Sequence, residues 1–476
     1  MVSNTVILTG VITKDVTLLA KDVNYLSGVV YVTKGVTVTV EEGAKVQGKS
    51  GANVAALVIC RGAKLIAKGT ADKPIVFTSA QPNPASGDWG GIVLLGTASV
   101  NQSLPWKGTT YKGLTSVEGG VNDAVVGYGL AGSGDPDFPT GNDADNSGTL
   151  QYVRIEYAGY AYLPDNELNS LTMAGVGNGT TIDHIQVTYA KDDAYEWFGG
   201  TVNCKYLIAY KTQDDDFDTD FGYSGNVQFG IALRDSLIAD ISKSEAFESD
   251  NDGKGNDFTP KTTAVFSNMT AIGPRIHPVY GKGNSLFYAG AQIRRNSGIS
   301  IQNSIIAGWP NGITIDESTV ATDGSTFKNL ADSTIRLKNI TLAGNTVDLL
   351  YVGKKIATDK STADVLAIFS TPFYNNTILG SSTPDYLKLI QPFNYANPDF
   401  TQYANNSTPT GGAGTDAFTA AWGSLGIWDN VNFQKNGSFT DSKLQNAFFD
   451  KTATFRGAVA PNGVNQTWWK GWTIWK

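Results

Sequence analysis

The sequence Asp192-Asp193-Ala194-Tyr195-Glu196-Trp197-Phe198-Gly199-Gly200 returns 22 residues later as Asp214-Asp215-Asp216-Phe217-Asp218-Thr219-Asp220-Phe221-Gly222. Thirty residues after that, Ala246-Phe247-Glu248-Ser249-Asp250 fits the same frame. One position of the frame therefore holds an acid every time, and the position two residues further holds Phe198, then Asp220, then Asp250. A short unit that returns in this way indicates successive coils of a solenoid.

In a solenoid the acids of this frame lie above one another. Stacked strands are about 4.8 Å apart, and two unit charges at that distance repel by roughly 3.5 kcal/mol at an effective dielectric constant of about 20. A bound cation, a neighbouring arginine or a raised pKa must relieve this repulsion. The acidic stack is therefore the strongest candidate site in the chain.

Two other repeats support the same architecture. The stretch 31–38 returns as 58–65, with β-branched residues that alternate around a glycine. Further on, an apolar residue stands two places before Asn268, Asn303, Asn339 and Asn375, and a glycine stands five places after each, at Gly273, Gly308, Gly344 and Gly380. We expect the asparagines to stack as an amide ladder and the glycines to supply a positive φ at the next corner.

These repeats predict an all-β protein, a right-handed parallel β-helix without a convincing helical segment. The coils of about 22 to 36 residues are too short for propeller blades, which need roughly 40 to 50. We expect the β-helix to span residues 1–385. Residues 83–148 lack the repeat and are rich in Pro and Gly, so we expect long side loops there. We expect residues 386–476, which are rich in aromatic residues, to form a C-terminal cap.

The composition narrows the function. The chain has 476 residues, 53 of them Gly, and only 17% are charged, which is typical of extracellular β proteins. The net charge of −8 and the absence of a basic stripe argue against nucleic-acid binding. The chain has no run of 18 apolar residues, so the sequence predicts no membrane-spanning segment. The sequence begins Met-Val-Ser-Asn without an export signal, so we expect that a signal sequence has been removed. Cys60 and Cys204 are expected to be buried free thiols.

Several motifs occur in an order that resembles a known family. They are Gly87-Asp88-Trp89-Gly90-Gly91-Ile92, Val153-Arg154-Ile155-Glu156-Tyr157-Ala158-Gly159, Asp165-Asn166-Glu167-Leu168-Asn169, the acidic blocks, and Ile293-Arg294-Arg295-Asn296. The chain resembles a family of secreted or surface-exposed β-helix proteins common in Bacteroidetes and often made as outer-membrane lipoproteins. The resemblance implies the fold and an exported location, and it implies no particular reaction.

The acidic stack suggests a Ca²⁺ site, because calcium takes six to eight hard oxygen ligands. The candidate ligands are Asp214, Asp215, Asp216, Asp218, Asp220, Glu248, Asp250 and Asp252, with a second group at Asn142, Asp143, Asp145 and Asn146. No segment matches the EF-hand loop, so the signal is the density of acids. The alternative is that Arg154, Arg275, Arg294 and Arg295 neutralise the stack as structural ion pairs.

The same face could act on or bind a glycan. Paired carboxylates cleave glycosidic bonds, and in β-helix lyases an arginine removes a proton beside a calcium-bound uronate. The weak catalytic candidates are Arg294, Arg295, Asp218 and Glu248. The candidate ligand-binding residues are Glu196, Trp197, Asp218, Asp220, Glu248 and Asp250. Trp89, Trp197 and Trp309 could form a sugar-stacking face, although a tryptophan at a coil corner is more often part of the core.

Taken together, these observations predict a secreted or cell-surface β-helix that binds a polysaccharide or another surface protein and holds structural calcium. Two alternatives remain open. One is a polysaccharide lyase or glycoside hydrolase that uses the acidic stack. The other is a purely structural envelope protein.

Overall fold

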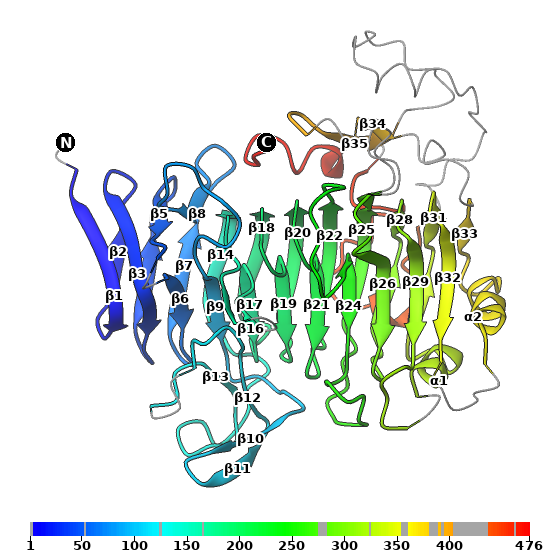
Figure 1. Ribbon diagram of the computed structural model, residues 1–476, viewed down its shortest axis with the longest axis horizontal. Helices are drawn as coiled ribbons and strands as arrows, with labels where there is room; N and C mark the ends of the chain where they lie inside the picture. Colours follow the sequence, from blue (N-terminus) through cyan, green and yellow to red (C-terminus); the bar gives the residue numbers. More distant parts are fainter. Residues whose placement is uncertain are drawn as a thin grey trace.

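In the computed structural model the chain winds into a right-handed parallel β-helix with three faces per coil (Figure 1). The structure describes residues 3–51, 54–122, 126–163, 166–274, 283–322, 325–353, 360–379, 389–391, 395–402, 437–460 and 463–476. The predicted fold is confirmed. The strands of the solenoid pair in parallel with those of the adjacent coils.

The first face carries short strands, each paired in register with the strand at the same position of the next coil. It contains β2 (Val16–Leu18), β4 (Thr37–Val40), β7 (Lys64–Lys68), the first halves of β14 (Gly148–Glu156), β18 (Thr181–Thr188), β20 (Asn203–Tyr210), β22 (Asn226–Leu233) and β25 (Val265–Ile272), then β27 (Ser300–Gln302) and β30 (Arg336–Lys338).

The second face continues from the first after a corner inside the long strands. It contains β5 (Lys45–Gly48), β8 (Ile75–Ser79), the second halves of those five long strands, β28 (Ile305–Ala307), β31 (Thr341–Ala343) and β33 (Thr377–Ile378). In the first coils, β1 (Thr5–Ile12) and β3 (Val23–Val32) bend through the second and third faces.

The third face carries the acidic repeat. It contains β6 (Ala56–Ile59), β9 (Gly91–Leu95), β17 (Leu171–Ala174), β19 (Tyr195–Phe198), β21 (Phe217–Asp220), β23 (Ser244–Glu245), β24 (Phe247–Ser249), β26 (Phe287–Arg294), β29 (Asn311–Asp316) and β32 (Val347–Val352). Every strand of the face is parallel to its neighbours, so residues at one sequence position form a column along the axis.

The corner between the first and second faces is a continuous stack of side chains. Residues with positive φ occupy it in eight coils: Tyr152, His184, Tyr206, Phe229, Asn268, Asn303, Asn339 and Asn375. Three of the four asparagines form the predicted amide ladder, whereas the Asn268 amide donates to the Ala453 and Phe455 carbonyls of the C-terminal segment. Asn375 Nδ2 donates to Asn339 Oδ1 at 2.9 Å, and Asn339 Nδ2 donates to Asn303 Oδ1 at 3.0 Å. In the earlier coils stacked rings replace the amides, with Tyr152 and Tyr206 each 4.3 Å from His184 between ring centroids.

The glycine prediction holds at two of the three described positions. Gly308 and Gly344 have φ of 78° and 64°. Gly273 occupies the same position in the preceding coil without a positive φ. There a Cβ would lie 2.8 Å from the Trp309 ring and 2.7 Å from the Gly308 carbonyl, so close packing is the reason for that glycine. Gly380 lies outside the described residues.

The inserted lobe leaves the third face after β9 and returns at β14. It contains two antiparallel pairs, β10 (Ser103–Trp106) with β11 (Thr109–Lys112), and β12 (Leu114–Ser116) with β13 (Leu130–Gly132), which form the lobe below the solenoid in Figure 1. A further short pair, β15 (Ala161–Leu163) with β16 (Asn166–Glu167), follows β14. Val117 and Val121 of the lobe pack against Val93 and Phe198 of the third face. The lobe therefore covers the outside of that face in the coils just before the acidic stack.

The aromatic C-terminal segment packs along the side of the solenoid. The described residues from 437 onward lie over the second face, where Trp468, Trp469 and Trp472 pack with Ile231 and Leu233. Buried Arg456 donates to the Ile340 carbonyl at 3.0 Å and to two threonine hydroxyls of neighbouring coils. A short antiparallel pair, β34 (Leu389–Gln391) with β35 (Asp399–Gln402), precedes this segment in the chain.

Two short helices lie at the C-terminal end of the solenoid, contrary to the expectation that the chain has no helix. They are α1 (Ser325–Ala331) and α2 (Thr362–Phe369), at the right of Figure 1. Phe327 and Leu330 of α1 and Val365 and Phe369 of α2 join the main core. These four apolar side chains cover core residues of the last coils, which no further coil would bury.

Candidate functional site

The predicted acidic column is present and in register. Glu196 of β19 pairs with Asp218 of β21, and Asp218 pairs with Glu248 of β24. Asp220 pairs with Phe198 in the same strands. Three carboxylates from three successive coils therefore lie one strand spacing apart on the outer side of the third face.

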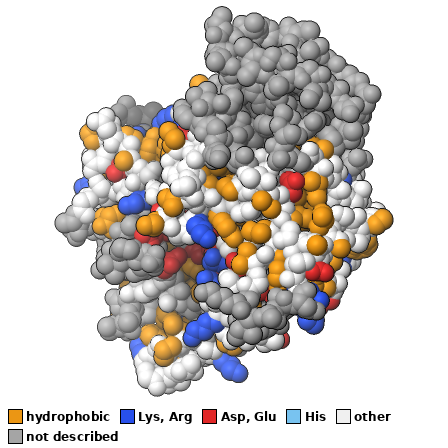
Figure 2. All heavy atoms as spheres, turned by 45° about the vertical axis from the view of Figure 1, so that its right-hand side comes forward, with side chains coloured by type: hydrophobic (Ala, Val, Ile, Leu, Met, Phe, Trp, Pro, Cys, Tyr) orange, Lys and Arg blue, Asp and Glu red, His pale blue; other side chains and the backbone are white. Residues whose placement is uncertain are grey.

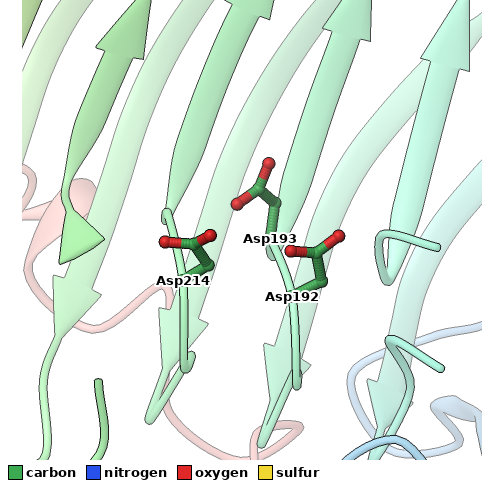
Figure 3. Close-up of side chains that lie close together, drawn as sticks. All are labelled: Asp192, Asp193 and Asp214. Atoms are coloured by element: carbon green, nitrogen blue, oxygen red, sulfur yellow. The ribbon is translucent and has the colours of Figure 1, made fainter. Parts of the chain in front are cut away.

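A second column of acids lies at the turn that leads into the same strands. The column begins at Asn169 and continues with Asp193, Asp215 and Glu245, and the first three of these side chains each accept a hydrogen bond from the next coil. The backbone N–H groups of Asp193, Asp215 and Glu245 donate to the side chains of Asn169, Asp193 and Asp215, at 3.2, 2.8 and 2.6 Å. Asp192 and Asp214 occupy the preceding position, as Figure 3 shows beside Asp193. The turn thus adds carboxylates to those of the strands.

The two columns bring carboxylate oxygens close enough to share ions. Four groups of three acids have oxygens within 4.8 Å of one another: Asp192, Asp193 and Asp214; Asp193, Glu196 and Asp218; Asp214, Asp215 and Glu245; and Asp215, Asp218 and Glu248. Each group shares a member with two of the others, so the carboxylate oxygens form one strip that runs along three coils.

Burial and mutual repulsion raise the pKa values of these carboxyl groups. Burial is the largest cause and raises the pKa of Asp193, Glu196, Asp215 and Asp218 well above the usual range, and neighbouring carboxylates raise them further. Burial also raises the pKa of Glu245 to about 8. Buried oxygens of Asp214, Asp218 and Glu245 accept no hydrogen bond. Each of these oxygens has an unused lone pair that a cation or a proton can satisfy.

The described arginines that pair with acids of the stack do so at its last coil. Arg294 forms ion pairs with Glu248 and, at 2.9 Å, with Asp250, and Arg295 pairs with Asp250 at 2.6 Å. In Figure 2, acidic side chains gather in one patch beside basic ones. Of the arginines expected to neutralise the stack, Arg154 instead pairs with Glu156 at 3.2 Å, and Arg275 lies outside the described residues. Glu196 and Asp218 have no ion-pair partner among the described residues.

The ion pairs also affect whether Arg294 can act as a base. Although burial lowers its pKa, the Glu248 and Asp250 carboxylates outweigh burial and raise the pKa well above the ordinary value. A guanidinium held charged in this way does not accept a proton at neutral pH. The arrangement therefore favours a structural role for Arg294.

Four predicted site residues are engaged elsewhere. Asp216 faces the interior, where its carboxylate lies 2.9 Å from the guanidinium of Arg234. Asp252 organises its own loop by accepting from the Asn256 backbone at 2.7 Å and from the Asn256 amide at 2.6 Å. Asp143 accepts from the Ser99 backbone at 2.9 Å, and Asp145 accepts from the Thr97 hydroxyl at 3.0 Å. These contacts hold the four carboxylates away from the stack, and none of the four belongs to an ion-sharing group among the described residues.

The sugar-stacking interpretation of the tryptophans is wrong. Trp89, Trp197 and Trp309 all have 0% exposure and belong to the main core. Trp197 follows Glu196 along β19, so strand alternation turns its ring inward, where it stacks on Tyr223 at 5.3 Å between centroids. Trp197 is therefore unavailable to a ligand. Cys60 and Cys204 are buried free thiols, as expected.

Sequence reasoning named Asp215 of the turn as a candidate ligand but missed Asp193 and Glu245, although the repeat contained them. Asp193, Asp215 and Glu245 stand at one position of the frame, directly before Ala194, Asp216 and Ala246. No sequence repeat pointed to Glu118, because it belongs to the irregular lobe. Its carboxyl lies beside Glu196 and Asn169, and burial raises its pKa to about 7. The lobe therefore places one acid at the first coil of the stack.

Comparison with known proteins supports the architecture. No curated protein and no solved structure matches the chain. Among the described residues, no helix is long and apolar enough to cross a membrane. The family described as the pectate-lyase-like β-helix domain matches residues 10–386, which include every coil of the acidic stack. The chain belongs to this pectate-lyase-like β-helix family.

Proposed function

We propose that the protein is an exported β-helix that binds Ca²⁺ along the acidic stack and presents this face to a polysaccharide or to another surface protein. The observation that carries the proposal is the strip of carboxylates on three coils, whose buried oxygens at Asp214, Asp218 and Glu245 accept no hydrogen bond. Calcium is the cation that suits many hard oxygen ligands with flexible geometry.

Electrostatics favours a cation over protons at neutral pH. The stack holds more carboxylates than the two arginines at its last coil can neutralise. Without a cation, several of these groups must stay protonated, which their raised pKa values reflect. A divalent ion would replace those protons and remove the repulsion between coils. A partly exposed ion can also bridge to an anionic sugar, which is why polysaccharide is the favoured partner.

The proposal is tested by thermal unfolding with calcium and with chelator. Ligand that binds only the folded protein stabilises it by about 2.7 kcal/mol when its concentration is about 100 times Kd. We expect a clear rise in Tm with millimolar Ca²⁺. The variant Asp218→Asn should lose most of this rise, yet keep or increase its Tm in chelator, because it removes a repelling charge.

Glu42→Gln is the matched control, since Glu42 is an exposed acid paired with Lys73 at 2.8 Å. It should keep the full response to calcium. An identical Tm for the unaltered protein in chelator and in calcium, together with no heat of binding in a calcium titration, would refute the proposed calcium site.

One observation favours a second candidate function, cleavage of a glycosidic bond. The Glu118 carboxyl lies beside that of Glu196, and burial raises the pKa of Glu118 to about 7. Glycosidases use two carboxyls, one of them protonated as a general acid. Glu118→Gln would remove the acid while it keeps the shape of the side chain. Release of reducing ends from a polysaccharide panel, abolished by this change, would establish the enzyme. Products from neither form would exclude cleavage of those substrates.

A further inference from the structure

The first coil of the solenoid has an edge strand whose outer side pairs with no other described strand. Strand β1 pairs only with β3 in the described part of the chain and lies at the left end of the solenoid in Figure 1. The Asn4 carbonyl accepts from the Val23 N–H of the next coil at 2.9 Å. Because the hydrogen-bonding groups of successive residues point to opposite edges of a strand, those of Thr5, Ile7 and Thr9 point away from the solenoid. The outer edge of β1 therefore offers donors and acceptors from three residues to another strand.

The core is also incompletely covered at this end. Val6, Ile12 and Val16 pack against the main core and are only partly buried. Val32 and Val38, which pair with Ile12 and Val16 one coil further on, have 0% exposure. The terminal coil of a solenoid needs a covering surface, because its inward side chains have a neighbour on one side only. The first coil therefore lacks both strand pairing and core contacts on its outer side.

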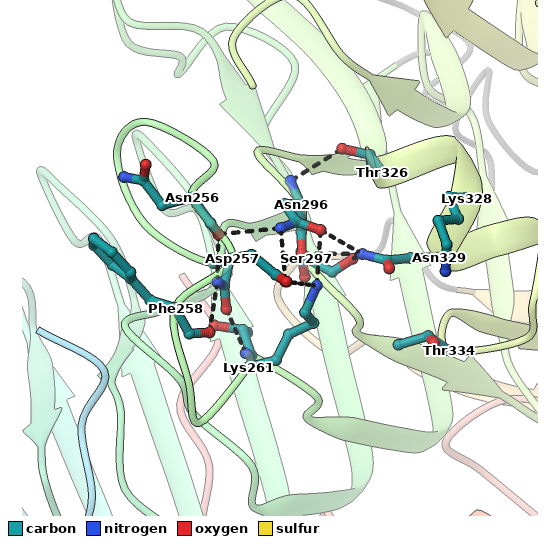
Figure 4. Close-up of polar contacts among 12 residues, drawn as sticks. Asn256, Asp257, Phe258, Lys261, Asn296, Ser297, Thr326, Lys328, Asn329 and Thr334 are labelled. Atoms are coloured by element: carbon teal, nitrogen blue, oxygen red, sulfur yellow. Dashed lines mark hydrogen bonds and ion pairs between the residues drawn. The ribbon is translucent and has the colours of Figure 1, made fainter. Parts of the chain in front are cut away.

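The opposite end of the solenoid is closed by α1 and α2. A hydrogen-bonded network holds α1 in place (Figure 4). The Asn329 amide donates to the Asn296 side-chain oxygen and to the Ser297 carbonyl, both at 2.9 Å, and the Thr326 hydroxyl accepts from the Asn296 N–H at 3.0 Å. With the helices in this position, the first coil of one copy cannot stack on the last coil of another. This argues against head-to-tail filaments and favours a two-fold contact between two first coils.

The sequence of β1 is self-complementary for such a contact. In Thr5-Val6-Ile7-Leu8-Thr9, a two-fold axis between the Ile7 residues of two antiparallel copies places Thr5 opposite Thr9 and Val6 opposite Leu8. The outer-edge residues Thr5, Ile7 and Thr9 then form the hydrogen-bonded pairs. Threonine pairs and apolar pairs stabilise adjacent strands. The half of β1 before the bend at Gly10 is thus suited to pair with itself.

The charges of the first coil favour the same contact. The whole chain has a net charge of −8, whereas residues 1–22 have two lysines and two aspartates and are neutral. Two copies that meet at this end therefore keep their acidic stacks apart. Exposed Lys14 and Asp15 lie at the corner between β1 and β2, opposite the face that carries Ile7. The two-fold axis through Ile7 brings Lys14 of each copy towards Asp15 of the other, which is a complementary arrangement.

We propose that two copies of the chain associate end to end through their first coils, with the two β1 strands paired antiparallel around Ile7. The pairing continues the sheet of the second face from one copy into the other. It also covers Val6, Ile12 and Val16 in each core. The two acidic stacks lie on either side of the two-fold axis of one elongated dimer, and the association requires neither calcium nor a glycan.

Light scattering of the whole protein after size-exclusion chromatography tests the association. We expect twice the mass of one chain, in calcium and in chelator. Ile7→Lys places two ammonium groups opposite each other on the two-fold axis, so it should shift the mass to that of one chain at the same loading concentration. Leu237→Lys is the matched control, because it adds the same charge at a side chain that is 63% exposed on the loop between β22 and β23. It should keep the mass of two chains.

Ile7→Cys tests the geometry without adding a charge. The Cα atoms of opposite residues in a hydrogen-bonded antiparallel pair are about 5.5 Å apart, a distance that suits a disulfide. Cys60 and Cys204 are buried free thiols, so they do not compete. Mild oxidation should convert most of the Ile7→Cys protein into a covalent dimer and leave Leu237→Cys unlinked.

Each result decides for or against the proposal. A mass of one chain for the unaltered protein at every concentration, a mass that grows beyond two chains, or a dimer that survives Ile7→Lys would overturn it. Equal cross-linking of Ile7→Cys and Leu237→Cys would also overturn it. A Tm of Ile7→Lys close to that of Leu237→Lys shows that the variant folds. If Ile7→Lys does not fold, the masses of the unaltered protein and the cross-linking of Ile7→Cys decide the question.

Discussion

Arg234 is a fully buried arginine at the inner side of the third face. It has 0% exposure, donates to the Thr212 carbonyl at 2.7 Å and pairs with equally buried Asp216 at 2.9 Å. Asp216 replaces the alanine that the repeat has at Ala194 and Ala246. The pair therefore places one charge of each sign where the neighbouring coils place a methyl group.

Removing the arginine alone should destabilise the protein strongly. Arg234→Met leaves Asp216 buried without its partner, and breaking such a pair costs about 3–5 kcal/mol. Adding Asp216→Asn should recover part of the loss, because the amide carries no charge. Urea unfolding of the two single variants and the double variant measures this as a double-mutant cycle. A single variant within about 0.5 kcal/mol of the original protein would show that the pair is energetically unimportant.

The corner stack is the element that keeps successive coils in register. Asn303, Asn339 and Asn375 have a positive φ of 50–55°, and hydrogen bonds between their side-chain amides link the three coils, with Asn339 bonded on both sides. Asparagine suits both demands, since it tolerates the left-handed conformation and carries a donor and an acceptor. In the earlier coils, aromatic residues adopt the same left-handed conformation at a greater conformational cost. There, ring contacts replace the hydrogen bonds.

The two roles of the ladder can be separated at Asn339. We expect Asn339→Ala to cost about 2–4 kcal/mol, because it removes two buried hydrogen bonds and forces alanine into a left-handed conformation. Asn339→Gly removes the same bonds without the steric strain, so it should be about 1 kcal/mol more stable than the alanine variant. Equal stability of the two variants in urea unfolding would show that the conformation of this corner contributes nothing.

The whole molecule joins the acids of three coils into one strip, so its stability depends on pH and calcium together. Burial raises the folded-state pKa of Glu245 to about 8 and of Glu118 to about 7. In the unfolded chain both groups titrate near 4.3. Between about pH 4 and pH 8 the folded state therefore binds more protons than the unfolded state, and the free energy of unfolding falls as pH rises.

We expect the chelated protein to lose stability on the order of a few kcal/mol between pH 5 and pH 8. In millimolar calcium this loss should be small or reversed, because the ion binds the ionised carboxylates and its affinity grows with pH. Unfolding curves across this range, with calcium and with chelator, measure both slopes. A chelated protein whose stability rises from pH 5 to pH 8 would contradict the raised pKa values.

The sequence alone predicted the features that depend on the repeat. Residues at one position of a repeat must stack once the coils are parallel, so the alignment of Glu196, Asp218 and Glu248 and the asparagine ladder followed from their spacing. The same rule would have added Asp193 and Glu245 to Asp215. Strand alternation likewise required Trp197 and Glu196 to face opposite sides.

Only the tertiary structure determined the contacts between segments that share no repeat. The approach of Glu118 to Glu196, the cleft between the lobe and the loop at Asp257 and Phe258, and the packing of the C-terminal tryptophans along the second face join residues far apart in the chain. The pairing of Arg234 with Asp216 also needed the folded interior. A repeat fixes its own neighbours by geometry, whereas an irregular segment folds onto whichever surface buries its apolar side chains, and no local pattern encodes that surface.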